Sequence, residues 1–495
     1  MSEAVKLSES ELWKKFLTGL VQSSLSLGKM GLRNPELRRI AFKEAGRRLH
    51  KMALARGSKQ AEDKYYISKA LLHSLERAME SKISPKCFDA LVNVFIGKML
   101  LGKDAKPKKK FQEEMGYEPP LFVLLCPTQR CNLKCIGCYT ASGRGEWGDT
   151  LRYEVVDRIV REVKELWGTH FMVLSGGEPL LYPHLFDIAR KHNDVFFLMY
   201  TNGTLIDEKM AERLAEVGNI TPAISVEGFE EETDARRGKG VYQKILAAFA
   251  NLREAGVPFG MSITVTRKNI STITSDEFYD FYFEKQKVKY QWQFHYMPIG
   301  RGYILDLMPT PQQRLLTRKR KRKMEREKEY FIGDFWNDGP SVGGCISAGR
   351  QGGGYFNITG RGDCTPCGFQ PYTADNINDV YEKGGSLNTV LKSDFFRAVR
   401  KWQCDYAYGK PDYEQGNLIM TCPIRDHFKG YYERILKEYH PRPIYPQAQE
   451  ALEDEEYKNG MMAYDRELKE LSGKIWDREY LNRENAVETA KCSPC

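Results

Sequence analysis

The sequence predicts an α/β protein: a partial (β/α)6 barrel of the TIM-like kind, preceded by a helical region and followed by a cysteine-rich region. Two observations support this class. Six short apolar runs alternate with amphipathic helical patterns between about residues 115 and 305, whereas residues 10 to 102 show helical spacing only. Repeated strand and helix units favour a parallel sheet whose functional residues gather at the carboxyl ends of the strands.

Changes in composition along the 495 residues suggest five segments, because a chain of this length exceeds one small domain. They are a helical, basic N-terminal region (1–105), the barrel (115–305), a basic helical bridge (306–339), the cysteine-rich region (340–430) and a helical tail (431–495).

The N-terminal region is basic and amphipathic. Apolar residues recur at three- to four-residue spacing from Leu12 to Val21 and from Leu37 to Ala53, and Met1 to Arg56 contain 12 Lys and Arg against 5 Asp and Glu. Such helices can lie at a membrane interface, for which Trp13 and Phe16 are well suited. A helix packed on the barrel with a solvated basic face explains the same pattern equally well.

The barrel strands are expected at the apolar runs of the central region. These are Leu121–Leu125, Phe171–Leu174, Val195–Tyr200, Thr221–Val226, Gly260–Val265 and Tyr290–Met297. Helical patterns separate them, and the one from Tyr242 to Ala255 ends at Gly256, a typical helix stop.

Three cysteines, Cys131, Cys135 and Cys138, directly follow the first predicted strand. Close thiolates bind iron or zinc, but structural zinc usually takes four protein ligands in two pairs, and no second pair follows nearby. The spacing therefore favours an iron-sulfur cluster with one open iron. Cys126 is expected to be a small buried apolar side chain instead of a fourth ligand.

Two further motifs follow the next strands: Ser175-Gly176-Gly177-Glu178-Pro179 and Thr201-Asn202-Gly203. Paired glycines let the backbone approach a ligand closely, and a glutamate suits an ammonium group. Alone, the glycine pair could equally form an ordinary turn.

In this order, the three motifs closely resemble the radical S-adenosylmethionine (SAM) superfamily. The resemblance implies an oxidoreductase in which three cysteines hold a 4Fe-4S cluster whose open iron chelates SAM, with ferredoxin or flavodoxin as electron donor. Reductive cleavage of SAM would give a 5'-deoxyadenosyl radical that abstracts hydrogen from an unactivated C–H bond. In one departure, Gly137 stands where the family often has an aromatic residue, and Tyr139 follows the third cysteine.

The resemblance also implies contacts to SAM. The glycine-glycine-glutamate motif would bind the amino group, and Ser225 and Arg237 the carboxylate and ribose; Arg236 and Arg237 could instead form surface salt bridges. Glu227 stands where an aspartate is frequent, and His295 is a candidate acid or base or else a structural histidine. The complete expected set is Tyr139, Ser175, Gly176, Gly177, Glu178, Asn202, Ser225, Glu227, Arg237 and Met297.

The later cysteines resemble the SPASM or twitch extension of radical SAM enzymes. This implies one auxiliary 4Fe-4S cluster held by Cys345, Cys367 and Cys422, with Cys364 or Cys404 as the fourth ligand. A structural zinc site is the alternative.

For the substrate, the basic N-terminal helices favour a membrane lipid alkyl chain, with carbon-carbon coupling as one outcome. A peptide or protein maturase is the alternative, and an iron-sulfur electron carrier without catalysis is a second. No signal peptide or bilayer-spanning run is seen, so a cytoplasmic location is expected, with peripheral association at the inner face of the membrane. The basic run from Arg318 to Lys323 is read as an exposed helix and not as a nucleic-acid site, and the terminal Cys492 and Cys495 resemble a reactive dithiol only weakly.

Overall fold

The computed structural model describes residues 32–100, 102, 105–143 and 149–481. The helix predicted from Leu12 to Val21, with Trp13 and Phe16, lies outside the described residues, as do Cys492 and Cys495. Within the described ranges, no helix combines the length and the apolar character needed to span a membrane.

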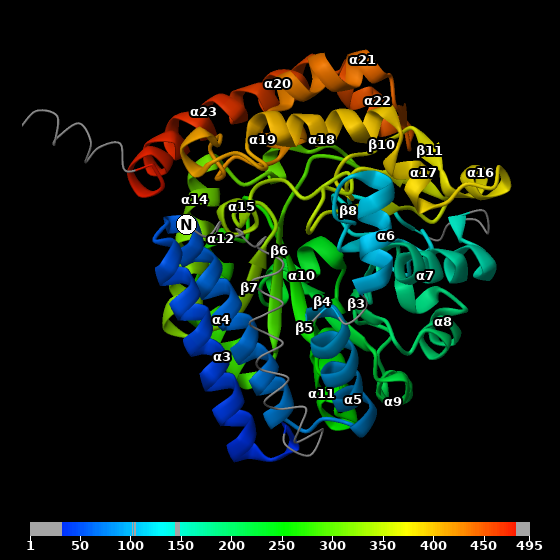
Figure 1. The fold of residues 1–495 in the computed structure, drawn as a ribbon, viewed down its shortest axis with the longest axis vertical. Helices are drawn as coiled ribbons and strands as arrows, with labels where there is room; N and C mark the ends of the chain where they lie inside the picture. The colour runs from blue at the N-terminus through cyan, green and yellow to red at the C-terminus, as the bar shows by residue number, and fades with distance from the viewer. Residues whose placement is uncertain (1–31, 101, 103–104, 144–148, 482–495) are drawn as a thin grey trace, which may run out of the picture.

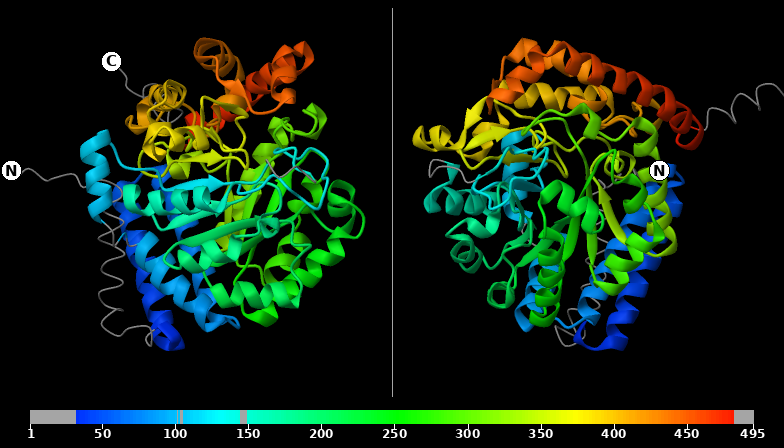
Figure 2. Two further views of the ribbon diagram at one scale, coloured as in Figure 1. Left: turned by 90° about the vertical axis from the view of Figure 1, so that its right-hand side faces the viewer. Right: turned by 180° about the vertical axis from the view of Figure 1, so that it is seen from behind.

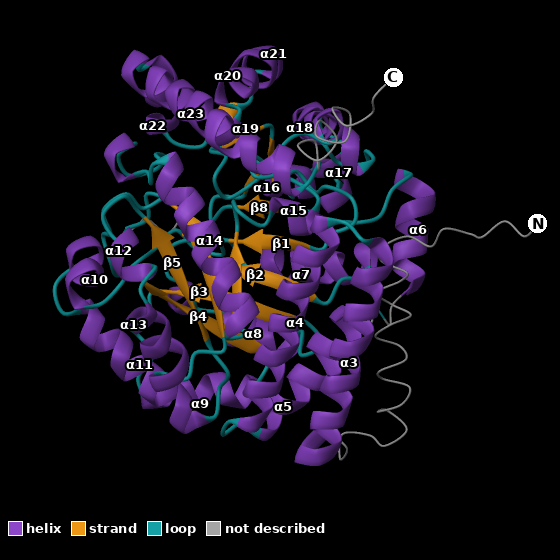
Figure 3. Cartoon of the chain, turned by 90° about the vertical axis from the view of Figure 1, so that its left-hand side faces the viewer, coloured by secondary structure: helices purple, strands orange, loops and turns teal. Residues whose placement is uncertain are grey.

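A parallel sheet forms the centre of the molecule, with helices around it (Figure 3). The six predicted strands are confirmed as neighbours in chain order, with Leu124 opposite Val173 and Val173 opposite Leu198. They are β1 (Phe122–Leu125), β2 (Phe171–Leu174), β3 (Phe196–Thr201), β4 (Ile220–Val226), β5 (Gly260–Val265) and β6 (Tyr290–His295).

Four further strands extend this sheet to ten, in the order β11-β9-β8-β1-β2-β3-β4-β5-β6-β7. At one edge β7 (Phe331–Asp334) runs parallel to β6; at the other, β8 (Tyr355–Ile358) runs parallel to β1, followed by antiparallel β9 (Asp363–Thr365) and β11 (Asp375–Asn376). These strands were not predicted from the sequence; β8, for example, pairs with β1 across more than 200 residues, and a local pattern does not show such a pairing. The predicted bridge and the cysteine-rich region thus both contribute strands to the barrel sheet.

Helices cover the outer face of the sheet, where alternate strand residues form the main core. The principal ones are α7 (Tyr153–Trp167), α8 (Leu185–Lys191), α9 (Glu208–Val217), α10 (Glu230–Arg237) and α11 (Val241–Ala255), with the short α12 (Ile270–Ile273), α13 (Asp276–Tyr279) and η4 (Asp280–Lys285). As predicted, α11 ends at Gly256, which adopts a left-handed conformation.

The N-terminal helices pack on the barrel. These are α3 (Pro35–Arg56), α4 (Lys59–Glu80), α5 (Pro85–Ala90) and the π-helical η1 (Leu91–Leu100), followed by α6 (Ala105–Met115). Ser74 on α4 donates a hydrogen bond to the carbonyl of Lys289, and the ring of Phe95 on η1 contacts those of Phe171 and Phe196. The helices α4 and η1 therefore pack on the barrel, whereas α3 still exposes Ile40 and Leu54 to solvent.

The basic run on α14 (Pro311–Glu327) is only partly exposed: Lys319 and Lys323 are exposed, as predicted, but one side of the run is covered. Arg318 and Lys321 are buried. Lys321 pairs with Glu325 at 2.7 Å and with Asp338 at 2.6 Å, which compensates the desolvation of its ammonium group. The sequence shows the positive charges but not the distant carboxylates that neutralise them.

The C-terminal helices lie across one end of the barrel (Figures 1 and 2). Tyr296 and Met308, which follow β6, share an apolar cluster with Met461 of the last helix. The elements after β7 include α15 (Gly339–Val342), α16 (Ile377–Glu382), α17 (Leu387–Leu391), α18 (Asp394–Tyr406), α19 (Pro423–Asp426), α20 (Phe428–Tyr431), η7 (Tyr432–Leu436), α21 (Lys437–Tyr439), α22 (Pro446–Glu453) and α23 (Glu455–Glu479), with the 3-10 turn η6 (Asp412–Glu414) and a small sheet of β10 (Tyr372–Thr373) and β12 (Arg442–Pro443). Two further 3-10 turns lie earlier in the chain: η3 (Pro179–Leu181) follows β2, and η5 (Leu305–Leu307) follows β6.

Candidate active site

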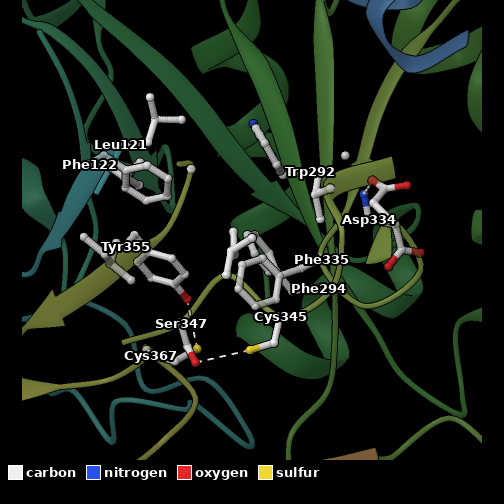
Figure 4. Close-up of a pocket in the computed structure, with 18 of the residues that line it drawn as sticks. Leu121, Phe122, Trp292, Phe294, Asp334, Phe335, Cys345, Ser347, Tyr355 and Cys367 are labelled. Atoms are coloured by element: carbon white, nitrogen blue, oxygen red, sulfur yellow. Dashed lines mark hydrogen bonds between the residues drawn. The ribbon is translucent and has the colours of Figure 1, made fainter. Parts of the chain in front are cut away.

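One cavity of about 1780 Å³ lies inside the barrel and reaches both groups of cysteines predicted from the sequence. Part of its wall is aromatic: Phe122, Trp292, Phe294, Phe335 and Tyr355 line it (Figure 4). A face of α4 forms another part of the wall, through Ala61, Lys64, Ile67, Ser68, Leu71 and Leu72. A single space therefore connects the two cysteine groups, the strand ends and the N-terminal helices.

The first cysteine group lies in the loop after β1. Cys131, Cys135 and Cys138 all line the cavity. Burial raises the pKa of the Cys131 thiol to about 11, and the nearby Glu178, Cys135 and Cys138 add to the shift. Three thiolates this close are favourable only with a cationic partner, so the donor set fits an iron-sulfur cluster.

Arg301, which the sequence did not single out, holds this loop in place. Its guanidinium donates to the carbonyl oxygens of Cys135, at 2.7 Å, and of Ser142, and its backbone N–H donates to the carbonyl of Cys138 at 2.9 Å. No feature of the sequence indicated that an arginine in the turn after β6 would support the cysteine loop.

The structure explains why Gly137 precedes the third cysteine. Its φ is 62°, and a Cβ atom there would lie 2.5 Å from Cε2 of Tyr296. The ring of Tyr296, at the end of β6, therefore stands beside the backbone of Gly137 and lines the cavity. An aromatic ring is present beside this position, supplied by another strand.

The glycine pair joins the end of β2 to the cysteine loop. The N–H of Gly177 donates to the carbonyl of Thr128 at 2.9 Å, and the N–H of Glu178 donates to that of Arg130 at 2.8 Å. Gly176 has a φ of 109°. Ser175, Gly176 and Gly177 line the cavity, so their backbone is placed for contact with a ligand.

Glu178 does not face the cavity, contrary to the expectation that it binds an ammonium group. Its fully buried carboxylate accepts hydrogen bonds from Oγ1 of Thr201 (2.7 Å), N–H of Asn202 (2.8 Å) and N–H of Leu180 (3.1 Å). Burial raises the pKa of Glu178, and these donors oppose that rise. The carboxylate thus fixes the end of β3 against the glycine loop, and Nδ2 of Asn202 reaches Sγ of Cys131 at 3.8 Å.

On the opposite wall, Ser225, Arg236 and Arg237 line the cavity. Both guanidinium groups donate to one oxygen of the buried Glu227, and Nη1 of Arg236 also reaches Thr264. The arginines are therefore held by a carboxylate beside the cysteine loop and do not form the surface salt bridges of the alternative. Ser225 lies 3.1 Å from Oγ of Ser262.

The remaining predicted residues follow β1, β2 and β6. His295 is fully buried, with Nε2 at 3.2 Å from Oδ2 of Asp334, and burial lowers its pKa. This environment is the one expected for a hydrogen-bonded structural histidine, although the residue borders the cavity. Met297 is buried in the wall, and the hydroxyl of Tyr139 lies 2.8 Å from Oγ of Ser175.

Three of the later cysteines, Cys345, Cys367 and Cys422, meet at the other end of the cavity. The predicted fourth ligands do not join them. Cys364 is on β9 opposite Ile358, with its thiol directed at the carbonyl of Gly362, and Cys404 is exposed on α18. Sequence proximity does not show which face of a short strand or helix a side chain occupies, so the fourth ligand stays a prediction. The three sulfurs nevertheless provide the soft donors that an auxiliary iron-sulfur cluster requires.

The fold and these two sulfur-lined sites define an iron-sulfur enzyme of the barrel type. The family model of the radical SAM superfamily matches residues 125–277. The chain is also 30% identical over 275 residues to the AdoMet-dependent heme synthase of Methanosarcina barkeri, which covers 51% of this chain and 78% of that protein. The protein belongs to the radical SAM superfamily.

Other relatives have different printed activities. Mycofactocin maturase MftC of Mycobacterium tuberculosis is 28% identical over 319 residues, covering 61% of this chain and 78% of that protein. The Fe-coproporphyrin III synthase of Methanosarcina barkeri is 29% identical over 204 residues, covering 41% of this chain and 50% of its own length. Native anSMEcpe, solved with bound AdoMet and a peptide, shares the fold at 19% identity and a TM-score of 0.50, covering 72% of this chain and all of that one.

Proposed function

We propose that this enzyme binds SAM between the Cys131, Cys135 and Cys138 cluster and the glycine pair, and directs the resulting radical at a C–H bond of a peptide. The cluster supplies the electron that cleaves SAM to methionine and a 5'-deoxyadenosyl radical. The observation that carries the proposal is the single cavity, because it joins the predicted SAM site to the auxiliary cysteines without a separating wall.

Each part of the cavity has a role in this proposal. The backbone at Gly176 and Gly177 would orient the methionine part of SAM, while Arg237 and Ser225 would face its polar groups. The aromatic part of the wall would shield a carbon radical from side reactions. The reacting part of the substrate is therefore apolar, such as a hydrophobic side chain.

A peptide substrate is preferred because of the breadth of the alignment with a maturase. The mycofactocin maturase matches over 61% of this chain, and PqqA peptide cyclase of Granulibacter bethesdensis is 31% identical over 160 residues. The lipid prediction depended on N-terminal helices free to lie on a membrane. Of those helices, Leu12 to Val21 lie outside the described residues, and α3 still exposes Ile40 and Leu54. The relatives therefore carry the preference for a peptide.

A tetrapyrrole is the second candidate substrate. Two of the relatives are named for haem and Fe-coproporphyrin synthesis. Flat macrocycles stack on aromatic rings, and the stacked pair of Phe122 and Tyr355, with centroids 4.9 Å apart, lies in the cavity wall. The aromatic side chains of the cavity would thus provide a stacking surface for a tetrapyrrole.

The test is substrate-dependent release of 5'-deoxyadenosine. Cells lacking the gene would be extracted into peptide, tetrapyrrole and lipid fractions, and each fraction incubated anaerobically with reconstituted enzyme, SAM and dithionite. Peptide modification predicts that the peptide fraction stimulates release at least tenfold and that prior protease digestion removes the stimulation.

Two variants make the test specific. Cys131→Ala should give no 5'-deoxyadenosine with any fraction. Ser68→Trp, which fills the α4 side of the cavity, should abolish the stimulation but leave the slow release without substrate. Stimulation only by the tetrapyrrole fraction, or only by lipids, would replace the peptide with that substrate.

A further inference from the structure

Two hydroxyl groups lie against the sulfurs of the auxiliary cysteines. The hydroxyl of Tyr355 is 2.9 Å from Sγ of Cys367, and that of Ser347 is 3.2 Å from Sγ of Cys345. Figure 4 shows both contacts as dashed lines, from Tyr355 to Cys367 and from Ser347 to Cys345. Each of these hydroxyls is thus placed to act on a different ligand sulfur.

The surroundings of Ser347 fix the direction of its hydrogen bond. Its Oγ accepts from Nε2 of Gln403 at 3.2 Å and from Nε2 of Gln370 at 3.4 Å. Amide nitrogens can only donate, so both acceptor positions of the hydroxyl are taken. Its one proton is left for Cys345, which has none to donate once it is bound to iron as a thiolate.

Tyr355 is held equally firmly. Its ring stacks on Phe122 at an interplanar angle of 11°, and it is only 2% exposed. A phenol has an ordinary pKa of about 10, so it is protonated at neutral pH and has one hydrogen to donate. The backbone N–H of Phe369 also donates to Sγ of Cys367, at 3.4 Å, so this sulfur receives two donors.

We propose that Tyr355 and Ser347 donate hydrogen bonds to the ligand thiolates of the auxiliary cluster and raise its reduction potential. One electron from a low-potential donor reduces the oxidised cluster and adds one negative charge. O–H dipoles directed at the sulfurs stabilise the more negative, reduced form more than the oxidised form. The inference rests on an auxiliary cluster being present and is independent of the identity of the substrate.

The test uses full-length protein in which Cys131, Cys135 and Cys138 are changed to alanine, so that only the auxiliary cluster contributes. Tyr355→Phe and Ser347→Ala are introduced separately and together. Tyr200→Phe is the matched control, because Tyr200 also lines the cavity and its ring packs against Phe294. The readouts are iron content, the midpoint potential from an EPR-monitored titration, and exchangeable-deuteron couplings of the reduced cluster in D2O.

We expect a more negative midpoint in each variant, an additive shift in the double variant, loss of one exchangeable coupling per hydroxyl removed, and no change in Tyr200→Phe. Unchanged midpoints and couplings with full iron content would overturn the proposal. If Tyr355→Phe loses its iron, that residue is structural and its tuning role is rejected; Ser347→Ala then decides the role of the second hydroxyl. Absence of iron in the parent would instead disprove the auxiliary cluster itself.

Discussion

Replacing Gly177 with alanine would place a methyl carbon 2.1 Å from the carbonyl oxygen of Arg130 and 2.6 Å from its carbonyl carbon. Both atoms belong to the backbone directly before Cys131, so no flexible side chain can move aside. To restore ordinary contact, the cysteine loop and the glycine loop must separate by about 1 Å. The φ of Gly177 lies outside the left-handed region, so steric conflict is the main effect.

A displacement of about 1 Å between reacting groups can cost about 100-fold in rate, or about 2.7 kcal/mol of barrier. We therefore expect Gly177→Ala to slow 5'-deoxyadenosine release about 100-fold in reconstituted enzyme and to weaken SAM binding. Gly473→Ala on α23 is the control, because a Cβ there meets nothing within 4 Å. A rate within a factor of three of wild type, with full iron content, would refute the argument that the glycine pair sets the position of the cluster loop.

Iron analysis of cysteine variants should show which residues hold the auxiliary cluster. Cys422→Ala is expected to lose that cluster, whereas Cys364→Ala and Cys404→Ala should keep it. Loss of iron in Cys364→Ala or Cys404→Ala would show that this cysteine is the fourth ligand. Glu178→Gln should lower the free energy of unfolding by about 1–3 kcal/mol, because the amide NH2 of glutamine would face backbone and hydroxyl donors. Thermal unfolding measures this loss, with Glu254→Gln at an exposed position as the control. Equal melting temperatures of the two variants would contradict the expectation. Asp465 has its pKa raised to about 8, mainly by burial, so its folded form binds a proton more tightly than the unfolded chain does. The free energy of unfolding of the wild type should therefore fall as the pH rises from about 4 to 8, by at most about 1.4 kcal/mol per pH unit. The Asp465→Asn variant should not show this fall. Parallel curves of unfolding free energy against pH for the two proteins, from about pH 5 to 9, would exclude a raised pKa of Asp465.

The order of the six central strands and the first cysteine site could be predicted because the evidence for each is local. An apolar run such as Phe171–Leu174 has a strand pattern in any context, and the spacing of Cys131, Cys135 and Cys138 is a property of one loop. The glycine pair was found for the same reason. The role of Glu178 was missed, because a carboxylate has the same sequence signature whether it binds a ligand or three donors of its own chain.

The segments outside the central strands were harder to predict. The strand β8 pairs with β1 across more than 200 residues, and α14 buries Lys321 against Asp338, contacts that depend on the packing of distant elements. The lipid prediction depended on the same missing information, since helical spacing such as that from Leu37 to Ala53 has the same periodicity on a membrane and against a protein surface.

By itself, the sequence determined the chemistry of this protein: three thiols, a glycine pair and parallel strand ends, each set by residues close together in the chain. The tertiary structure decided which side chains share the cavity. Its lining includes Cys345, Cys367 and Cys422 but not Cys364 or Cys404, and it also includes Tyr296, Tyr355 and a face of α4. Outside the cavity lining, Arg301 supports the cysteine loop. These contacts join residues far apart in sequence, and only the packing of the barrel against both flanking regions fixes them.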